Sequence, residues 1–171
     1  HRLGIALMAK ETGILCYSVD YRLAPENPYP AALDDAWQAY HQIIQANPNR
    51  RIILSGDSAG GGLALALAMK LRDEKGRLPD DLILFSPWTD LTCRGDSFAS
   101  KAKVDPMFTT SMPRDCSHYY APKGVDMTDP YISPAFGDVS ELPRCLILCG
   151  GNEILLSDSE SLALKFEDSG G

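Results

Sequence analysis

A single serine stands between two glycines in the pentapeptide Gly56-Asp57-Ser58-Ala59-Gly60. The apolar run 51–54 before it is typical of a short strand, and the apolar, glycine- and alanine-rich run 61–71 after it is typical of a helix. Strand, G-x-S-x-G and helix together indicate a nucleophile elbow, a sharp turn that exposes a serine hydroxyl for attack on a carbonyl. The backbone N–H of Ala59, at the helix N-terminus, would stabilise the resulting oxyanion. The alternative interpretation is that Ser58 merely begins the helix as its N-cap.

The residues around this serine have predicted structural roles. Gly56 and Gly60 are expected to remove side chains that would collide where the strand and the helix cross. Asp57 is adjacent to the serine, but consecutive residues at such a turn point apart. We therefore predict that Asp57 is a buried or hydrogen-bonded support and takes no part in the reaction.

Two carboxylates follow the predicted strand 144–148, and either could accompany the serine. Glu153 comes directly off the end of that strand, where the site residues of an open α/β sheet gather. Asp158 begins the following helix, where a carboxylate often only complements the helix dipole. We predict that Glu153 is the acid that orients a histidine base, in the chain order serine, acid, histidine.

The three histidines present, His1, His41 and His118, do not suit the role of that base. His41 falls on a predicted helix away from the serine, His118 falls in the stretch 111–120, and His1 is terminal. Each is predicted to be a surface or packing residue.

Composition narrows the class of protein. The 171 residues suffice for one domain, 44% are hydrophobic and 23% are charged, as in ordinary globular proteins. A net charge of −7 argues against nucleic acid or an anionic membrane as partner, and no apolar run reaches membrane-spanning length. Five cysteines, an odd number without C-x-x-C, indicate a reducing, cytoplasmic location. Histidine and cysteine spacing fits no zinc site, and we expect no metal and no cofactor.

Apolar strands alternate with helices along the chain, and the strands lack polar alternation. This pattern predicts an α/β fold, with a mostly parallel sheet and helices on both faces. Residues 92–140 interrupt the pattern with five prolines and are expected to form a cap-like excursion over the carboxyl edge of the sheet. The predicted strands are 14–19, 51–55, 81–86 and 144–148. The predicted helices are one ending near Gly13, then 30–46, 59–75, 111–120 and 157–168.

In four segments, taken in order, the chain resembles the hormone-sensitive lipase group of α/β-hydrolases, the carboxylesterase branch. They are the signature 20–36, the elbow Gly56-Asp57-Ser58-Ala59-Gly60-Gly61 (GDSAGG), the segment 86–91, and the stretch from Ile132-Ser133-Pro134 to 150–159. The resemblance implies a serine carboxylesterase or lipase-like hydrolase that cleaves small-molecule esters through an acyl-enzyme. It also implies a Ser-acid-His triad, in which the family usually has aspartate where this chain has Glu153, although some members use glutamate.

Parts of the family pattern are absent. The His-Gly-Gly-Gly oxyanion segment would precede His1, and the triad histidine would follow Gly171. We therefore expect residues 1–171 to be a single partial catalytic domain, truncated at both ends and inactive alone. Two alternatives stay open: a non-catalytic ligand-binding member of the same fold, and an amidase or acyltransferase with the same parts. An oligomer is possible.

Some side chains are weaker candidates. Trp88, Met107 and Phe108 could line a substrate pocket, and each could equally be an ordinary core residue. Tyr21, Arg22 and Glu26 offer a hydroxyl, a fork donor and a carboxylate in one short loop. We expect these three to satisfy one another and the nearby backbone, and so to brace the oxyanion loop.

Overall fold

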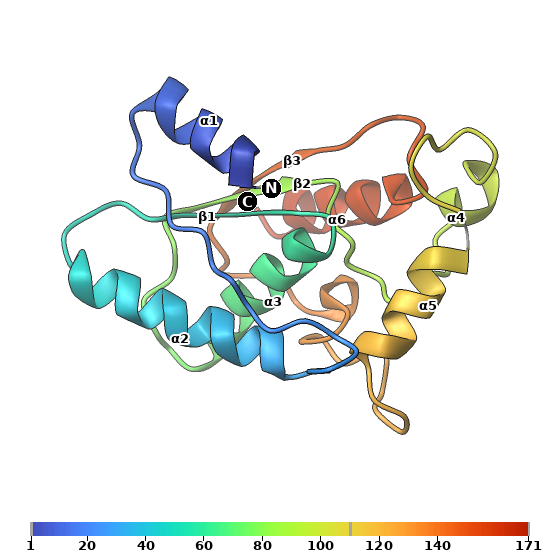
Figure 1. Cartoon of the computed structure of the whole chain (residues 1–171), viewed down its shortest axis with the longest axis horizontal. Coiled ribbons are helices and arrows are strands. Elements are labelled where there is room, and N and C mark those ends of the chain that lie inside the picture. Colours follow the sequence, from blue (N-terminus) through green and yellow to red (C-terminus); the bar gives the residue numbers. More distant parts are fainter. Residues whose placement is uncertain (1, 110, 171) are drawn as a thin grey trace.

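The computed structural model describes residues 2–109 and 111–170 as an α/β arrangement of helices around a short parallel sheet (Figure 1). The strands are β1 (Ile53–Asp57), β2 (Asp81–Phe85) and β3 (Arg144–Leu148). The helices are α1 (Arg2–Thr12), α2 (Ala31–Ala46), α3 (Ala59–Asp73), α4 (Ser97–Ser100), α5 (Ser111–Tyr120) and α6 (Leu156–Asp168), with a 3-10 turn, η1, at Pro134–Phe136.

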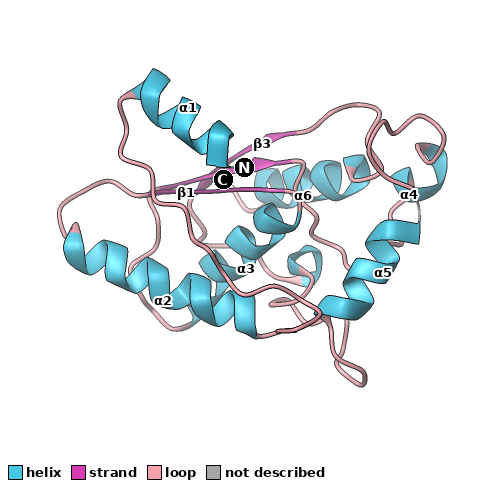
Figure 2. Cartoon of the chain, in the orientation of Figure 1, coloured by secondary structure: helices cyan, strands magenta, loops and turns pink. Residues whose placement is uncertain are grey.

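The three strands run parallel in the order β1-β2-β3 (Figure 2). Ile53 is paired with Asp81 and Asp81 with Arg144, so the strands start level and end level. Their carboxyl ends, Asp57, Phe85 and Leu148, therefore lie along one edge of the sheet. Ser58 follows the first of these ends, and the loop with Glu153 follows the third.

Helices α3 and α6 cover one face of the sheet, with α3 against β1 and β2 and α6 against β3. The core between them contains Leu65, Met69, Leu82, Leu84 and Leu162, all essentially inaccessible to solvent. Helix α2 packs on α3 as a further layer. Helix α1 lies on the opposite side of the strands (Figure 1).

The segment 14–19, predicted to be a strand, forms no sheet ladder in the described part of the chain. Its apolar side chains are largely exposed, with Leu15 71% accessible. The prediction was wrong at this place because an extended apolar run becomes a strand only through hydrogen bonds to a neighbour. Composition alone cannot show whether that neighbour is there.

Strand β1 lies two residues later than predicted. The N–H of Ile52 donates to the Asp80 carboxylate (2.7 Å) and the carbonyl of Ile52 accepts from the Asp80 N–H (2.8 Å). These bonds to a turn residue occupy Ile52, and regular pairing with β2 begins at Ile53. The strand then runs through Gly56 to Asp57, so that it leads directly into Ser58.

The excursion 92–140 has its own apolar cluster. Helix α5 appears where it was predicted, and α4 and η1 are additional short elements. The buried members of the cluster come from the excursion and from the segments beside the sheet edge: Trp88, Leu91, Cys93, Phe98, Ala121, Ile132, Ile154 and Leu155. Because Ile154 and Leu155 directly follow Glu153, the excursion is packed against the segment that carries this carboxylate.

Arg22 has a different partner from the one expected. Its guanidinium makes a bidentate pair with Asp35 on α2, at 2.7–3.1 Å, and its own N–H donates to the same carboxylate. These bonds hold the pKa of Asp35 at about 2. The loop after residue 20 is thus tied to α2. The expectation that Tyr21, Arg22 and Glu26 satisfy one another was wrong for Arg22, because its guanidinium is bonded to Asp35.

Candidate active site

Ser58 occupies the sharp turn between β1 and α3. Its backbone angles are φ 52° and ψ −122°, a conformation that costs a non-glycine residue energy and persists only when the surroundings impose it. The surroundings here are hydrogen bonds: the Ser58 N–H donates to the Phe85 carbonyl (2.9 Å), and its carbonyl accepts from the N–H groups of Gly61, Gly62 and Trp88 (3.0–3.2 Å). The end of β2 therefore holds the turn in place.

The Ser58 hydroxyl is not used to cap the helix. Ser58 is at the N-cap position of α3, yet its side chain makes no capping hydrogen bond. The side-chain oxygen of a serine that only began a helix would ordinarily accept a hydrogen bond from one of the first free N–H groups. The simple N-cap interpretation therefore does not fit, and a half-buried hydroxyl stands at the carboxyl edge of the sheet.

The glycines of the elbow are needed at three positions, and one of the two expected positions was wrong. A Cβ on Gly56 would lie 2.1 Å from the Gly60 carbonyl oxygen, so Gly56 is required as predicted. A Cβ on Gly60 would meet nothing closer than 3.8 Å. The close approach instead involves Gly61 and Gly62. A Cβ on Gly61 would lie 2.9 Å from the Pro87 Cβ, and a Cβ on Gly62 would lie 2.1 Å from the Trp88 carbonyl oxygen. The consecutive glycines 60–62 were the only sequence signal for this.

We expect Gly62→Ala to destabilise the fold by about 3 kcal/mol or more, because neither backbone at the contact can yield cheaply. Gly60→Ala serves as the matched control and should change stability by less than about 1 kcal/mol, since alanine also suits a helix better than glycine. Urea denaturation of both variants measures the difference. Equal effects of the two substitutions would contradict this description of the elbow.

Ala59 is the first residue of α3 and is exposed. The N–H groups of the first helical turn have no carbonyl acceptor within their own helix. The Ala59 N–H therefore belongs to the positive end of the α3 dipole, directly beside Ser58. This is the environment in which a developing negative charge is stabilised.

Asp57 is exposed, so of the two predicted alternatives, burial or a hydrogen-bonded support, burial does not apply. Its charge lies near Tyr21, where burial and the negative charge of Asp57 together raise the pKa of the phenol. The Tyr21 hydroxyl is also the group nearest to a Cβ placed on Gly60. Tyr21 thus lies beside the elbow, a neighbour that was not predicted for it.

Glu153 lies on the loop after β3 and is partly buried. Its Oε1 accepts a hydrogen bond from the Gly150 N–H (2.9 Å), and its Oε2 lies 3.7 Å from the Cys149 Sγ. In the sheet, β2 separates β3 from β1, and two strand spacings amount to about 10 Å. Ser58 and Glu153 thus follow strand ends at the same edge of the sheet, with β2 between those strands.

Asp158, the rival carboxylate, is buried in the first turn of α6. Its Oδ2 accepts hydrogen bonds from the N–H groups of Thr89 and Asp90, both at 2.8 Å. These bonds tie α6 to the loop after β2. The carboxylate is therefore occupied with the backbone and is not presented to a substrate or to a histidine.

The environment of Asp158 predicts that the stability of the chain depends on pH. Burial, opposed by the two backbone N–H bonds, raises the pKa of Asp158 from 3.8 to about 6. The folded state then holds this proton more tightly than the unfolded state, so the stabilisation is complete below pH 3.8 and is lost as the pH rises through about 6.

Between pH 4 and pH 7 this group should lower the free energy of unfolding by about 2 kcal/mol. Asp158→Asn keeps an oxygen for the two N–H groups and removes the titration. Urea denaturation of both proteins across this range measures the effect as a difference, so that all other titrating groups cancel. Parallel curves for the two proteins would show that Asp158 does not titrate in this range.

The two described histidines are engaged within their own helices. His41 Nδ1 lies 2.9 Å from the Trp37 carbonyl, and its ring stacks on the Trp37 indole with 4.0 Å between centroids. His118 Nδ1 lies 2.6 Å from the Arg114 carbonyl. Both fit the predicted packing or surface role. His1 lies outside the described residues.

The three candidate pocket residues have different environments. Trp88 is buried in the cluster of the excursion, where its indole N–H donates to the Asp90 carbonyl (3.0 Å). Phe108 packs against the same cluster, whereas Met107 is 76% exposed. Trp88 and Phe108 thus belong to one apolar group beside Ile154, and Met107 does not.

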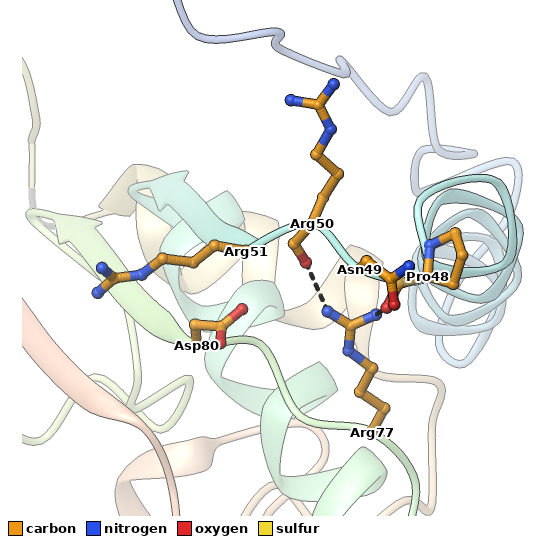
Figure 3. A pocket seen from close by; sticks show the side chains of 6 residues that line it. All are labelled: Pro48, Asn49, Arg50, Arg51, Arg77 and Asp80. Atoms are coloured by element: carbon orange, nitrogen blue, oxygen red, sulfur yellow. Dashed lines mark hydrogen bonds between the residues drawn. The ribbon is translucent and has the colours of Figure 1, made fainter.

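A hollow of about 670 Å³ lies at the other end of the strands, away from Ser58 (Figure 3). Arg77 donates to the carbonyls of Pro48 and Arg50 there, and Arg51 is paired with Asp81. These bonds join the loop before β1 to the loop before β2, so Arg77 and Arg51 have a structural role here.

In the described ranges no three His, Cys, Asp or Glu side chains are grouped as a metal would require. No helix described here has the length and apolarity needed to cross a bilayer.

Comparison with known proteins gives consistent matches. Residues 1–171 match the family model described as the alpha/beta hydrolase fold. An esterase of Acinetobacter venetianus is 36% identical over 170 residues, which are 99% of this chain and 56% of that protein. The crystal structure of an esterase/lipase from an uncultured bacterium superimposes with a TM-score of 0.91 at 38% identity, covering 99% of this chain and 57% of that one.

A crystal structure titled as an esterase from the bacterial hormone-sensitive lipase family matches with a TM-score of 0.83 at 37% identity, covering 88% of this chain and 51% of that one. The chain spans about half the length of the curated relatives it matches. The elbow at Ser58, the parallel sheet and these matches agree. The chain therefore belongs to the alpha/beta hydrolase fold family, in the group related to hormone-sensitive lipase.

Proposed function

We propose that these residues are the nucleophile-bearing part of a serine carboxylesterase or lipase-like hydrolase. The observation that carries the proposal is the conformation of Ser58, which is held at positive φ by three elements while its hydroxyl caps nothing. Strain of this kind is maintained where it presents a reacting group. The relatives named as esterases support the same class of reaction.

In the proposed reaction the Ser58 hydroxyl attacks the ester carbonyl while a histidine takes its proton. The Ala59 N–H stabilises the oxyanion of the tetrahedral intermediate, which collapses to an acyl-serine and releases the alcohol. Water, activated by the same histidine, then frees the acid. Neither His41 nor His118 is proposed for this role, so the base comes from another part of the protein.

Glu153 is proposed to hold that histidine in the correct tautomer and to stabilise its protonated form. The carboxylate is suited to this because the Gly150 N–H fixes one oxygen and the loop places it at the edge of the sheet that carries Ser58. Asp158 is not proposed, since its oxygen is already occupied by two backbone N–H groups.

The substrate is proposed to be a small-molecule carboxylic ester, with Trp88, Met107 and Phe108 as pocket candidates. All five cysteines are free, and a reducing, cytoplasmic location is proposed on that basis. Amide hydrolysis or acyl transfer would need the same groups. We place ester hydrolysis first because the matched relatives are named esterases.

Pre-steady-state hydrolysis of p-nitrophenyl butyrate by the full-length protein tests the proposal. An acyl-enzyme mechanism predicts turnover, with a burst of p-nitrophenol whose amplitude approaches the enzyme concentration if deacylation is slower than acylation. If turnover occurs without a burst, the acyl-enzyme is tested for by adding hydroxylamine and measuring how the acyl group is divided between hydroxylamine and water. Saturable binding of the ester without any turnover would contradict the proposal and favour a ligand-binding protein.

A further inference from the structure

Asp105, in the excursion, binds two separate segments at once. Its Oδ1 accepts hydrogen bonds from the N–H groups of Met107 (2.7 Å) and Phe108 (2.9 Å). Its Oδ2 accepts a hydrogen bond from the N–H of Ile154 (2.8 Å), which is 49 residues further along the chain. One carboxylate therefore joins the Met107–Phe108 turn to the residue directly after Glu153.

The same excursion also holds the carbonyl of Ile154. The Ser97 hydroxyl donates to it and is bonded to Ser157 as well, 2.6 Å from the Ser157 hydroxyl and 3.0 Å from the Ser157 nitrogen. Ser97 and Ile154 are both buried. Both backbone polar groups of Ile154 are thus bonded to side chains of the excursion, the carbonyl to the buried Ser97 and the N–H to the partly buried Asp105.

Gly95 also packs closely on the start of α6. A Cβ placed on Gly95 would lie 2.2 Å from the Ser157 hydroxyl, so a larger side chain there would have to displace Ser157. Burial alone would raise the pKa of Asp105, but the hydrogen bonds from the N–H groups of Ile154, Met107 and Phe108 together lower it. The carboxylate therefore stays charged and keeps both oxygens as acceptors. The position of the Glu153 loop follows the position of the excursion.

We propose that Asp105 is a positioning residue, which fixes the Glu153 loop by its bond to Ile154 and couples it to the candidate pocket residues Met107 and Phe108. This inference rests on the proposed function, in which Glu153 orients the histidine. A carboxylate displaced by about 1 Å at such a site can cost a hundred-fold in rate. The bond from Asp105 therefore acts on kcat through Glu153 and not through contact with the substrate.

Asp105→Asn in the full-length protein is the test. An amide keeps one acceptor oxygen and presents an N–H₂ at the other position, so it cannot serve both segments. We expect kcat for p-nitrophenyl butyrate to fall about 10- to 100-fold, with KM within about two-fold. Asp126→Asn is the matched control. Asp126 also makes a local turn, in which it accepts from the N–H and the hydroxyl of Thr128, but it holds no second segment in the contacts described, so this variant should leave kcat unchanged.

A pH profile and a double mutant separate positioning from general weakening. A displaced Glu153 stabilises the protonated histidine less, so the acid limb of kcat/KM should move to lower pH in Asp105→Asn. In a Glu153→Gln background the Asp105 substitution should add little further loss. Fully multiplicative losses, or an unmoved acid limb, would overturn the inference.

Ser97→Ala provides a second variant if Asp105→Asn does not fold. It removes the bond to the Ile154 carbonyl alone and should lower kcat about 3- to 10-fold with the same shift of the acid limb. Suppose that Glu153→Gln is impaired but that Ser97→Ala and a folded Asp105→Asn are both fully active. That result would refute the inference that Asp105 positions the Glu153 loop. If Glu153→Gln itself is fully active, the proposed function of Glu153 fails instead.

Discussion

Ser58→Ala in the full-length protein is expected to lower kcat for a short-chain aryl ester by about three orders of magnitude or more. The substitution removes only the nucleophilic oxygen. Because the Ser58 side chain makes no capping bond, and its backbone N–H and carbonyl keep their partners, the fold should remain intact. Steady-state kinetics, together with a urea denaturation curve of the variant, measure the two effects separately.

Ser55→Ala is the matched control for this prediction, since Ser55 is an exposed serine on β1, three residues before Ser58. It should retain the activity of the unmodified protein. A Ser58→Ala protein that is folded and keeps more than about a tenth of the activity would show that Ser58 is not the nucleophile.

Glu153→Gln is expected to lower kcat by about two to four orders of magnitude with little change in KM. Glutamine can still accept from the Gly150 N–H, but it cannot hold a histidine in the required tautomer or stabilise its protonated form. Asp158→Asn provides the comparison at the rival carboxylate and should change kcat only slightly. Kinetics of the two variants at one pH suffice for the test, and the reverse order of effects would transfer the role of the acid to Asp158.

The elbow could be predicted because its signals are local. The strand, the turn and the helix are consecutive, and G-x-S-x-G specifies the turn between them. Helices α2, α5 and α6 could be predicted for the same reason, because the residues that indicate each helix lie close together in the sequence. The place of Glu153 after β3 also followed from order along the chain.

The errors concern contacts between distant segments. Whether 14–19 pairs as a strand depends on a neighbour, and where β1 begins depends on Asp80. The partner of Arg22 is on the next helix. That Gly62, and not Gly60, faces the loop after β2 depends on how the helix is rotated against Trp88. The spacing of apolar residues along the sequence does not indicate such contacts between distant segments.

Asp105 was missed for the same reason. In the sequence it precedes a proline within an irregular stretch, which suggests only a turn. Its bond to Ile154 spans 49 residues and appears once the excursion is folded against α6. Asp158 was recognised as a helix-start carboxylate, but its burial under the Thr89–Asp90 backbone could not be foreseen.

Covalent labelling tests the central claim most directly. The full-length protein is treated with a fluorophosphonate, which reacts with serines activated as nucleophiles, and the labelled peptide is located by mass spectrometry. We predict one modified residue, Ser58, with parallel loss of ester hydrolysis and no labelling of Ser58→Ala. Modification of a different serine, or full loss of activity without modification of Ser58, would contradict the assignment of the nucleophile.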